Sequence, residues 1–240
     1  MERIIKMSDF HVPFQDPEAI KPAFDFVGEM QPEQLVIDEV IDFYSISKFC
    51  KDPKRKLNLQ KDLDSAAKIL KRIRCILPNT RIIMVESNHD ERLTKYLNSK
   101  AEELSQLRAL KFESLMGLKA LEIEYKVDYI HKHVLFKHGD MVKTRSGDTA
   151  NAELSKEGVS GVTGHTHRLA MIYKTLRGGA FVWVEGGCLC KIKNIEYIDG
   201  TANWQQGISM FTFERYSNHF RAEVLPIIDK KISWGNMIFK

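Results

Sequence analysis

Two histidines, His165 and His167, lie two positions apart behind a glycine in the stretch VTGHTH. On extended backbone, side chains at positions i and i+2 point to the same side of the chain. Both imidazoles can therefore face one site, and imidazole nitrogen is a common ligand of transition-metal ions. An isolated G-H-x-H is equally consistent with a polar loop whose histidines contact solvent. The rest of the chain has to decide between these two interpretations.

Histidine, carboxylate and asparagine side chains follow four short apolar runs, RIIKM, QLVI, RIIMV and HVLF. Each run predicts a buried strand, and five of the eight histidines lie just past a strand end. Besides the GHTH residues, these strand ends supply Asp9 and His11, Asp38, Glu39 and Asp42, Asn88, His89 and Asp90, and His138 and Asp140. Imidazole, carboxylate and amide groups from separate strands suit a pair of divalent ions of the Mn, Fe, Zn or Mg type, with a carboxylate between them. Such pairs lie about 3.5 to 4 Å apart and hold a hydroxide for in-line attack on phosphorus.

Helical patterns alternate with these strands. From Leu59 to Leu77 apolar residues keep a helical spacing, and the opposite face carries Lys68, Lys71, Arg72 and Arg74. This basic face is either solvated surface or a path for a polyanion. After a predicted helix at residues 151–157, segments rich in Val, Ile, Phe and Trp predict a second sheet packed on the first. The predicted fold class is α/β, a two-sheet sandwich flanked by helices, with ligands at the carboxyl ends of the strands.

The chain of 240 residues has no repeat and no low-complexity linker, so we expect a single domain over residues 1–240. Residues 100–117 predict a helix and loop inserted between the third and fourth polar strand ends. Within this insertion Phe112, Leu115 and Met116 form either a packing seam or a lid over the site. We favour packing.

Composition limits the partners and the compartment. Lys and Arg outnumber Asp and Glu by 36 to 32, and this net charge of +4 does not by itself indicate a nucleic-acid partner, although it suits an anionic substrate. The four cysteines form no C-x-x-C pair, which favours a reduced, cytoplasmic compartment. We find no signal-peptide pattern and no apolar run of about 18 residues, so we expect a soluble protein with no membrane partner. Oligomeric state stays open, with a homodimer among the alternatives.

The strand-end residues resemble the ordered signature of the calcineurin-like metallophosphoesterase superfamily, D-x-H, G-D-x-x-D, G-N-H-D/E, a histidine often followed by glycine, and G-H-x-H. The resemblance covers nearly the whole chain. It implies a dinuclear hydrolase with one ion on Asp9, His11 and His167 and a second on Asn88, His138 and His165, bridged by the second motif. It also implies that His89 assists the leaving oxygen as general acid or electrostatic stabiliser. Mn²⁺ is the ion expected first, with Fe, Zn, Ni and Mg as the alternatives.

Two segments resemble those of small bacterial and phage phosphoesterases of the DNA-repair-exonuclease-like type. They are the stretch DFYSISKF after the second motif and the sequence HGD in the fourth motif. This resemblance implies a phosphodiester substrate. DNA ends or cyclic nucleotides then rank above phosphoproteins, and a monoester is the main alternative.

Two positions depart from the superfamily pattern. In VIDEVID, alignment on the following D-F-Y puts Asp38 at the family's glycine and Glu39 at its bridging aspartate. The extra methylene can displace the carboxylate by about 1.5 Å, which predicts reduced turnover. A register shifted by one residue would make Asp38 the bridge, and we favour Glu39. Ser87 replaces the glycine of the third motif. The alternative function is therefore a protein that keeps the fold but has lost hydrolysis and serves as a binding module for nucleic acid or protein.

Five further residues lie beside the motifs and are candidates for contact with substrate phosphate or for bracing a ligand histidine. They are Asp42, Asp90, Arg92, Asp140 and Arg168.

Overall fold

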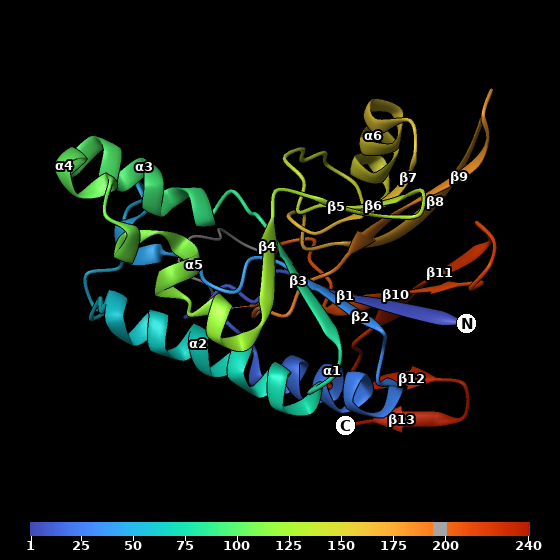
Figure 1. The fold of residues 1–240 in the computed structure, drawn as a ribbon, viewed down its shortest axis with the longest axis horizontal. Coiled ribbons are helices and arrows are strands. Elements are labelled where there is room, and N and C mark those ends of the chain that lie inside the picture. Colours follow the sequence, from blue (N-terminus) through green and yellow to red (C-terminus); the bar gives the residue numbers. More distant parts are fainter. Residues whose placement is uncertain (194–200) are drawn as a thin grey trace.

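The computed structural model describes residues 1–193 and 201–240, and two β-sheets form its body (Figure 1). In spatial order, the first sheet consists of β11 (Phe220–Pro226), β10 (Gly207–Phe213), β1 (Glu2–Met7), β2 (Gln34–Ile37), β3 (Arg81–Val85) and β4 (Ile123–Lys126). The second sheet consists of β5 (Tyr129–His131), β6 (Val134–Phe136), β7 (Ser160–Thr163), β9 (Gly179–Gly186) and β8 (Leu169–Leu176). A separate ribbon pairs β12 (Ile232–Trp234) with β13 (Met237–Phe239).

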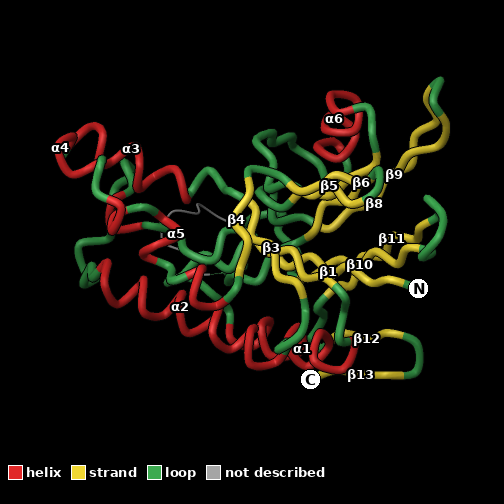
Figure 2. The backbone as a smooth tube through the Cα atoms, in the orientation of Figure 1, coloured by secondary structure: helices red, strands yellow, loops and turns green. Residues whose placement is uncertain are grey.

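Helices cover both outer faces of the two sheets, as the coloured tube shows (Figure 2). Helices α1 (Pro17–Met30) and α2 (Leu59–Ile76) lie against the first sheet, and α6 (Asp148–Glu157) lies against the second. The remaining helices are η1 (Tyr44–Ile46), α3 (Asp90–Lys100), α4 (Glu102–Ser105), η2 (Arg108–Leu110), α5 (Phe112–Leu115) and η3 (Leu118–Leu121). None of the helices in the described part of the chain combines the length and the apolar character needed to cross a membrane.

Apolar side chains fill each of the three spaces between these layers. Between the sheets, Ile4, Val36 and Ile83 of the first sheet meet Phe136 and Val184 of the second. A larger cluster lies between the first sheet and helices α1 and α2, and a smaller one, which includes Trp183 and Leu154, lies under α6. Strands β1, β2 and β3 are buried on both faces, which explains why their sequences are continuous apolar runs.

The predicted two-sheet α/β sandwich flanked by helices is confirmed, but one assignment of strands was wrong. The expectation was that the segments after Gly158 build the second sheet, whereas β10 and β11 return to the first sheet, where β10 pairs antiparallel with β1. Strand β1 would otherwise expose an unpaired edge, and β10, which is buried along nearly its whole length, covers that edge. Pairing across such a distance in sequence cannot be inferred from local patterning.

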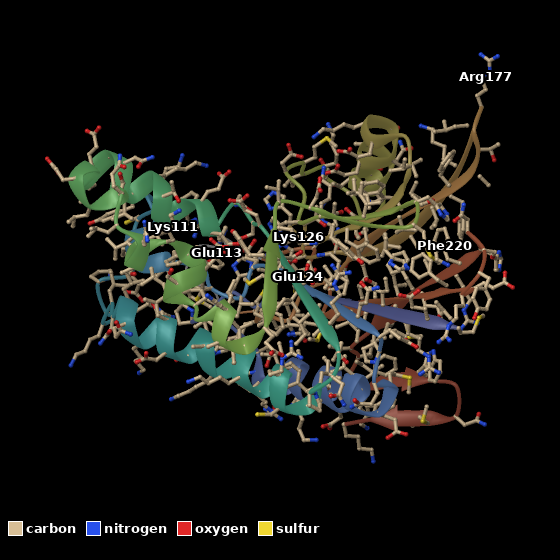
Figure 3. The ribbon with its side chains drawn as sticks, viewed as in Figure 1. Lys111, Glu113, Glu124, Lys126, Arg177 and Phe220 are labelled. Atoms are coloured by element: carbon tan, nitrogen blue, oxygen red, sulfur yellow. The ribbon has the colours of Figure 1, made fainter. Side chains whose placement is uncertain are left out.

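The segment at residues 100–117 is a set of short helical turns. Phe112 and Met116 are buried in the main apolar cluster, and the Phe112 ring contacts the rings of Phe43 and Tyr125. Packing is thus the role of these two side chains, as favoured above. At the other end of the molecule the β8–β9 hairpin extends beyond the body, and Arg177 at its tip points away from it (Figure 3).

Candidate metal centre

The carboxyl ends of five parallel strands converge on one place. Strands β1, β2 and β3 run parallel in the first sheet, and β6 and β7 run parallel in the second. The loops that follow these strands bring together the eight residues predicted as ligands or catalytic group, Asp9, His11, Glu39, Asn88, His89, His138, His165 and His167. A cavity of about 230 Å³ opens onto five of these eight residues, including His89 and His167. This is the edge at which open α/β sheets hold their ligands.

Glu39 lies at the centre of this group and is almost fully buried. Its Oε1 is 2.6 Å from Nε2 of His11, and its Oε2 is 2.7 Å from Nε2 of His138. Nevertheless, neither oxygen accepts a hydrogen bond of acceptable geometry from the described residues. A buried carboxylate without hydrogen bonds is costly unless a cation satisfies it. A divalent ion beside each Glu39 oxygen would satisfy this buried carboxylate.

The ligand atoms fall into two sets that share Glu39. The first set contains Asp9, His11 and His167, with the Nε2 atoms of the two histidines 2.8 Å apart. The second contains His138 and His165, and Oδ1 of Asn88 lies 2.8 Å from Nε2 of His138. Ions with bonds of about 2.1 Å to nitrogen and oxygen place neighbouring ligand atoms about 3 Å apart. The donor set and its spacing therefore fit two divalent ions.

Asp38 faces a different partner. Its carboxylate forms an ion pair with the fully buried Lys6 and lies 3.3 Å from both Oγ of Ser8 and the backbone nitrogen of Asp9. Its other contact is with Nδ1 of His138, at 3.5 Å, on the side of the ring away from Glu39. This contact is no hydrogen bond, so Lys6 is the main partner of Asp38, although the carboxylate also lies within reach of an ion shared with Asp9 and His138.

The charges in the centre influence one another strongly. Burial lowers the pKa of His11 and His138, but the Glu39 carboxylate beside both rings outweighs it, and both pKa values lie well above the ordinary imidazole value. Burial raises the pKa of Glu39, but the neighbouring histidines hold it well below its usual range. Burial, together with the neighbouring His138, lowers the pKa of His165 to about 4.

The backbone of the centre explains the glycine of the GHTH motif. A Cβ atom on Gly164 would lie 2.5 Å from Oδ2 of Asp9, so only glycine allows the carboxylate to approach this loop. The next backbone nitrogen, that of His165, donates to both Asp9 oxygens at 3.1 Å. Asp9, His11, Glu39, His165 and His167 all have φ between 42° and 65°, a region that residues other than glycine rarely adopt. Such strain concentrates at functional sites.

No corresponding need for glycine exists in the third motif. Ser87 and Asp90 exchange hydrogen bonds, with the Ser87 nitrogen donating to Asp90 Oδ2 at 3.0 Å and the Asp90 nitrogen donating to Ser87 Oγ at 3.2 Å. This reciprocal pair closes the turn that leads into α3. Burial raises the pKa of Asp90 to about 8. The serine that departs from the family pattern is therefore accommodated by a helix start.

His89 is held by a network that includes Asp42 and Arg92. Nη2 of Arg92 donates to Nε2 of His89 at 2.7 Å, and its Nη1 donates to Oδ1 of Asp42 at 2.7 Å. Because a guanidinium only donates, Nε2 of His89 accepts, and the ring proton is on Nδ1, 3.0 Å from Glu39. Oδ2 of Asp42 also accepts from Nδ1 of His11 at 2.9 Å. Asp42 therefore orients one candidate ligand and holds the arginine beside the cavity.

Two of the five neighbouring candidates have other roles. Asp140 is exposed and pairs with Lys156 at 3.3 Å, and it contacts no candidate ligand histidine among the described residues. Arg168 donates from Nε to the carbonyl of Asn203 at 3.2 Å and from Nη1 to the carbonyl of Lys143. Its guanidinium connects two loops and does not reach the cavity.

Sequence reasoning missed the aromatic wall of the cavity. Tyr44, Phe49 and Trp204 line it, and the Trp204 ring centroid lies 4.1 Å from that of His167. Two of them lie within the stretch DFYSISKF after the second motif, where the clustering of aromatic residues was the available signal. Trp204 had no such signal, because it reaches the site from a loop far along the chain.

The fold and the site define an α/β/β/α sandwich with a candidate two-metal centre at the strand ends, and relatives with the same span exist in bacteriophages. No family model matches the chain. The Gene 54 protein of Mycobacterium phage D29 is 31% identical, over 97% of this chain and 96% of its own. The Gene 54 protein of Mycobacterium phage L5 is 30% identical, over 100% and 99%. The chain belongs to the family of these phage Gene 54 proteins.

Two solved structures show weak likeness. Chaetomium thermophilum Vps29 matches 95% of this chain and 87% of its own, at 10% identity and a TM-score of 0.48. The same protein complexed with a cyclic peptide matches 94% and 96%, at 11% identity and a TM-score of 0.39.

Proposed function

We propose that this protein is a metal-dependent phosphoesterase of the calcineurin-like type that hydrolyses phosphodiesters with two divalent ions. The observation that supports it best is the Glu39 carboxylate, whose two buried oxygens each lie against a histidine of a different ligand set without accepting a hydrogen bond. A single tetrahedral ion cannot use all the ligands gathered here. A carboxylate shared by two ions accounts for both the geometry and the absence of hydrogen bonds.

In this proposal one ion is held by Asp9, His11 and His167 and the other by Asn88, His138 and His165, with Glu39 common to both. Mn²⁺ is expected first, and Fe, Zn, Ni and Mg also suit these nitrogen and oxygen donors. Such an ion pair, when bound, polarises the phosphoryl oxygens and lowers the pKa of water in the site.

The protein's own residues then orient the ester. Arg92 is fixed by Asp42 at the cavity wall, where a guanidinium suits the oxygens of a phosphate. His89 lies between Arg92 and Glu39, and once substrate displaces the arginine contact, the doubly protonated ring would donate the proton on Nε2 to the leaving oxygen. The aromatic side chains Tyr44, Phe49 and Trp204 limit the access of water from the open side.

The test uses purified protein stripped with a chelator and reloaded with Mn²⁺. We expect Mn²⁺-dependent hydrolysis of bis-p-nitrophenyl phosphate, faster than that of p-nitrophenyl phosphate. His89→Ala should lower kcat by about 10² to 10⁴, with unchanged metal content by mass spectrometry and unchanged circular dichroism. His219→Ala, outside the site, is the matched control. Metal binding without turnover on either ester would favour the binding module, and turnover of the monoester alone would overturn the preference for diesters.

A further inference from the structure

A second groove continues from the metal cavity along α3. It has a volume of about 500 Å³, within the range of about 300 to 1,000 Å³ that is usual for ligand sites. Its lining residues come from two segments, Ile46, Ser47, Lys48 and Phe49 after the second motif, and Asn88, Arg92, Lys95, Tyr96, Ser99 and Lys100 on and before α3. Phe49 and Arg92 line both the groove and the metal cavity, so the two spaces are continuous.

Cations and exposed aromatic rings alternate in this groove. Along α3, residues 92, 95, 96, 99 and 100 keep the spacing of a single helix face. Phe49 and Tyr96 are 55% and 41% exposed, so both side chains are accessible to a bound partner. Arg92 lies over the Phe49 ring at 5.6 Å. Aromatic faces flanked by cations are the combination with which proteins bind unpaired bases and their phosphates.

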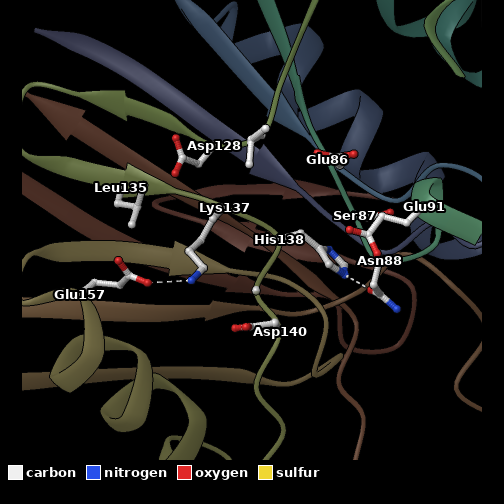
Figure 4. Close-up of a pocket in the computed structure, with 12 residues that line it drawn as sticks. Glu86, Ser87, Asn88, Glu91, Asp128, Leu135, Lys137, His138, Asp140 and Glu157 are labelled. Carbon is white, nitrogen blue, oxygen red and sulfur yellow. Dashed lines mark hydrogen bonds and ion pairs between the residues drawn. The ribbon is translucent and has the colours of Figure 1, made fainter. Parts of the chain in front are cut away.

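The opposite side of the site has the opposite charge. Next to Asn88 and His138 lies a pocket lined by the acidic residues Glu86, Glu91, Asp128, Asp140 and Glu157 (Figure 4). Its cation, Lys137, is already paired with Glu153 at 3.0 Å and with Glu157 at 2.9 Å. A polyanion is repelled from this pocket and attracted to the groove on α3. A strand that reaches the metal centre therefore has one favourable direction in which to continue.

On the basic face of α2, the other candidate path for a polyanion, two of the four cations have structural contacts. The Arg74 guanidinium donates to the carbonyls of Leu121, Leu77, Thr80 and Glu122 at 2.9 to 3.0 Å. Arg72 lies over the Phe24 ring at 5.0 Å. On α3, Arg92 pairs with Asp42 and Lys95 pairs with the exposed Glu91, and both cations line a groove that opens into the site.

We propose that this groove binds the terminal nucleotides of an unpaired nucleic-acid strand, with a base stacked between Phe49 and Tyr96 and phosphates against Arg92, Lys95 and Lys48. The proposal rests on the function proposed above, because it places the scissile diester at the metal centre. An unpaired strand can use both the aromatic rings and the cations of the groove, because its base faces are free to stack. A duplex hides the faces of its bases. Because the acidic pocket beyond the site repels a polyanion, the nucleic-acid strand does not continue past the metal centre. In this proposal, cleavage therefore starts at an end of the nucleic-acid strand.

Binding is tested separately from catalysis. Fluorescence anisotropy with chelator-treated protein compares a labelled twelve-nucleotide unpaired DNA, the same sequence as RNA, and the matching duplex. We expect the unpaired strands to bind at least tenfold more tightly than the duplex, with affinity that falls as salt rises. Tyr96→Ala should weaken binding on the order of tenfold, and Lys95→Ala with Lys100→Ala should reduce the salt dependence. Tyr216→Ala, which removes a ring 93% exposed outside the groove, is the control.

Equal affinity for duplex and unpaired strand, or an unchanged affinity in Tyr96→Ala, would overturn the assignment of the groove. Cleavage of a linear unpaired strand, compared with its covalently closed circle in the presence of Mn²⁺, tests the one-sided approach. The circle should be cut at least tenfold more slowly, and equal rates would overturn this part. Groove binding with no hydrolysis of bis-p-nitrophenyl phosphate would refute the proposed function while leaving the groove assigned.

Discussion

Lys6 and Asp38 form an ion pair in which neither side chain has any exposed surface. The pair lies under the loop that follows β1, and the same Asp38 carboxylate contacts Nδ1 of His138. A buried charge left without its partner typically costs about 3 to 5 kcal/mol. The residue that stands where the superfamily has glycine is thus part of the support beneath the centre.

Asp38→Ala should lower the free energy of unfolding by about 3 to 5 kcal/mol, because it leaves the Lys6 ammonium buried without a counter-charge. The double variant Lys6→Met with Asp38→Leu should recover most of this loss, since two apolar side chains of similar size replace the pair. Urea unfolding followed by circular dichroism measures both. A stable Asp38→Ala variant that binds no metal would instead make Asp38 a ligand.

Glu39→Gln keeps the shape of the side chain but removes its charge, and we expect metal content to fall below two ions per chain and turnover to be lost. Glu39→Asp tests the expectation from sequence that the longer glutamate reduces turnover, and the geometry of the centre favours the opposite result. The glutamate already reaches both ligand sets at 2.6 and 2.7 Å, so a side chain shorter by about 1.5 Å should weaken metal binding. A faster Glu39→Asp enzyme with unchanged metal content would show that the glutamate is a defect in the native site.

His165→Ala should remove one ion and leave the other. His165 lies near His138 and Glu39 in the second ligand set, whereas the first set of Asp9, His11 and His167 does not depend on it. Titration with Mn²⁺ followed by calorimetry should therefore change from two binding events to one. Loss of both events would mean that the two sites form only together.

Gly164→Ala should disrupt the centre without altering any ligand. The new Cβ would meet Oδ2 of Asp9 at 2.5 Å, and this carboxylate is fully buried and cannot move aside. We expect weaker metal binding and a lower melting temperature. Gly178→Ala is the matched control, because a Cβ there makes only an ordinary contact of 3.4 Å with the Phe181 ring. Equal metal affinity in the two variants would contradict the role we give to Gly164.

The candidate ligands were predictable because chemistry and periodicity are local. Each lies just past an apolar run that must be buried, and parallel strands carry their carboxyl ends to one edge. His11, His89 and His138 could therefore be placed at a common site from the spacing of runs and histidines alone. The same local patterns predicted the α/β sandwich, the helix of α2 and the packing role of Phe112.

Other features depend on contacts between segments far apart in the chain. Asp38 and Glu39 are adjacent carboxylates that both suit the bridge in sequence, where Glu39 is favoured, and only the tertiary structure shows that Asp38 pairs with Lys6. The return of β10 to the edge of β1 depends on which edge is left open. The groove joins residues 46–49 to the face of α3, and Trp204 reaches His167 from a distant loop. Sequence determined which groups are available for chemistry, and tertiary packing decided which of them face one another, because burial and charge pairing act between segments that share no local pattern.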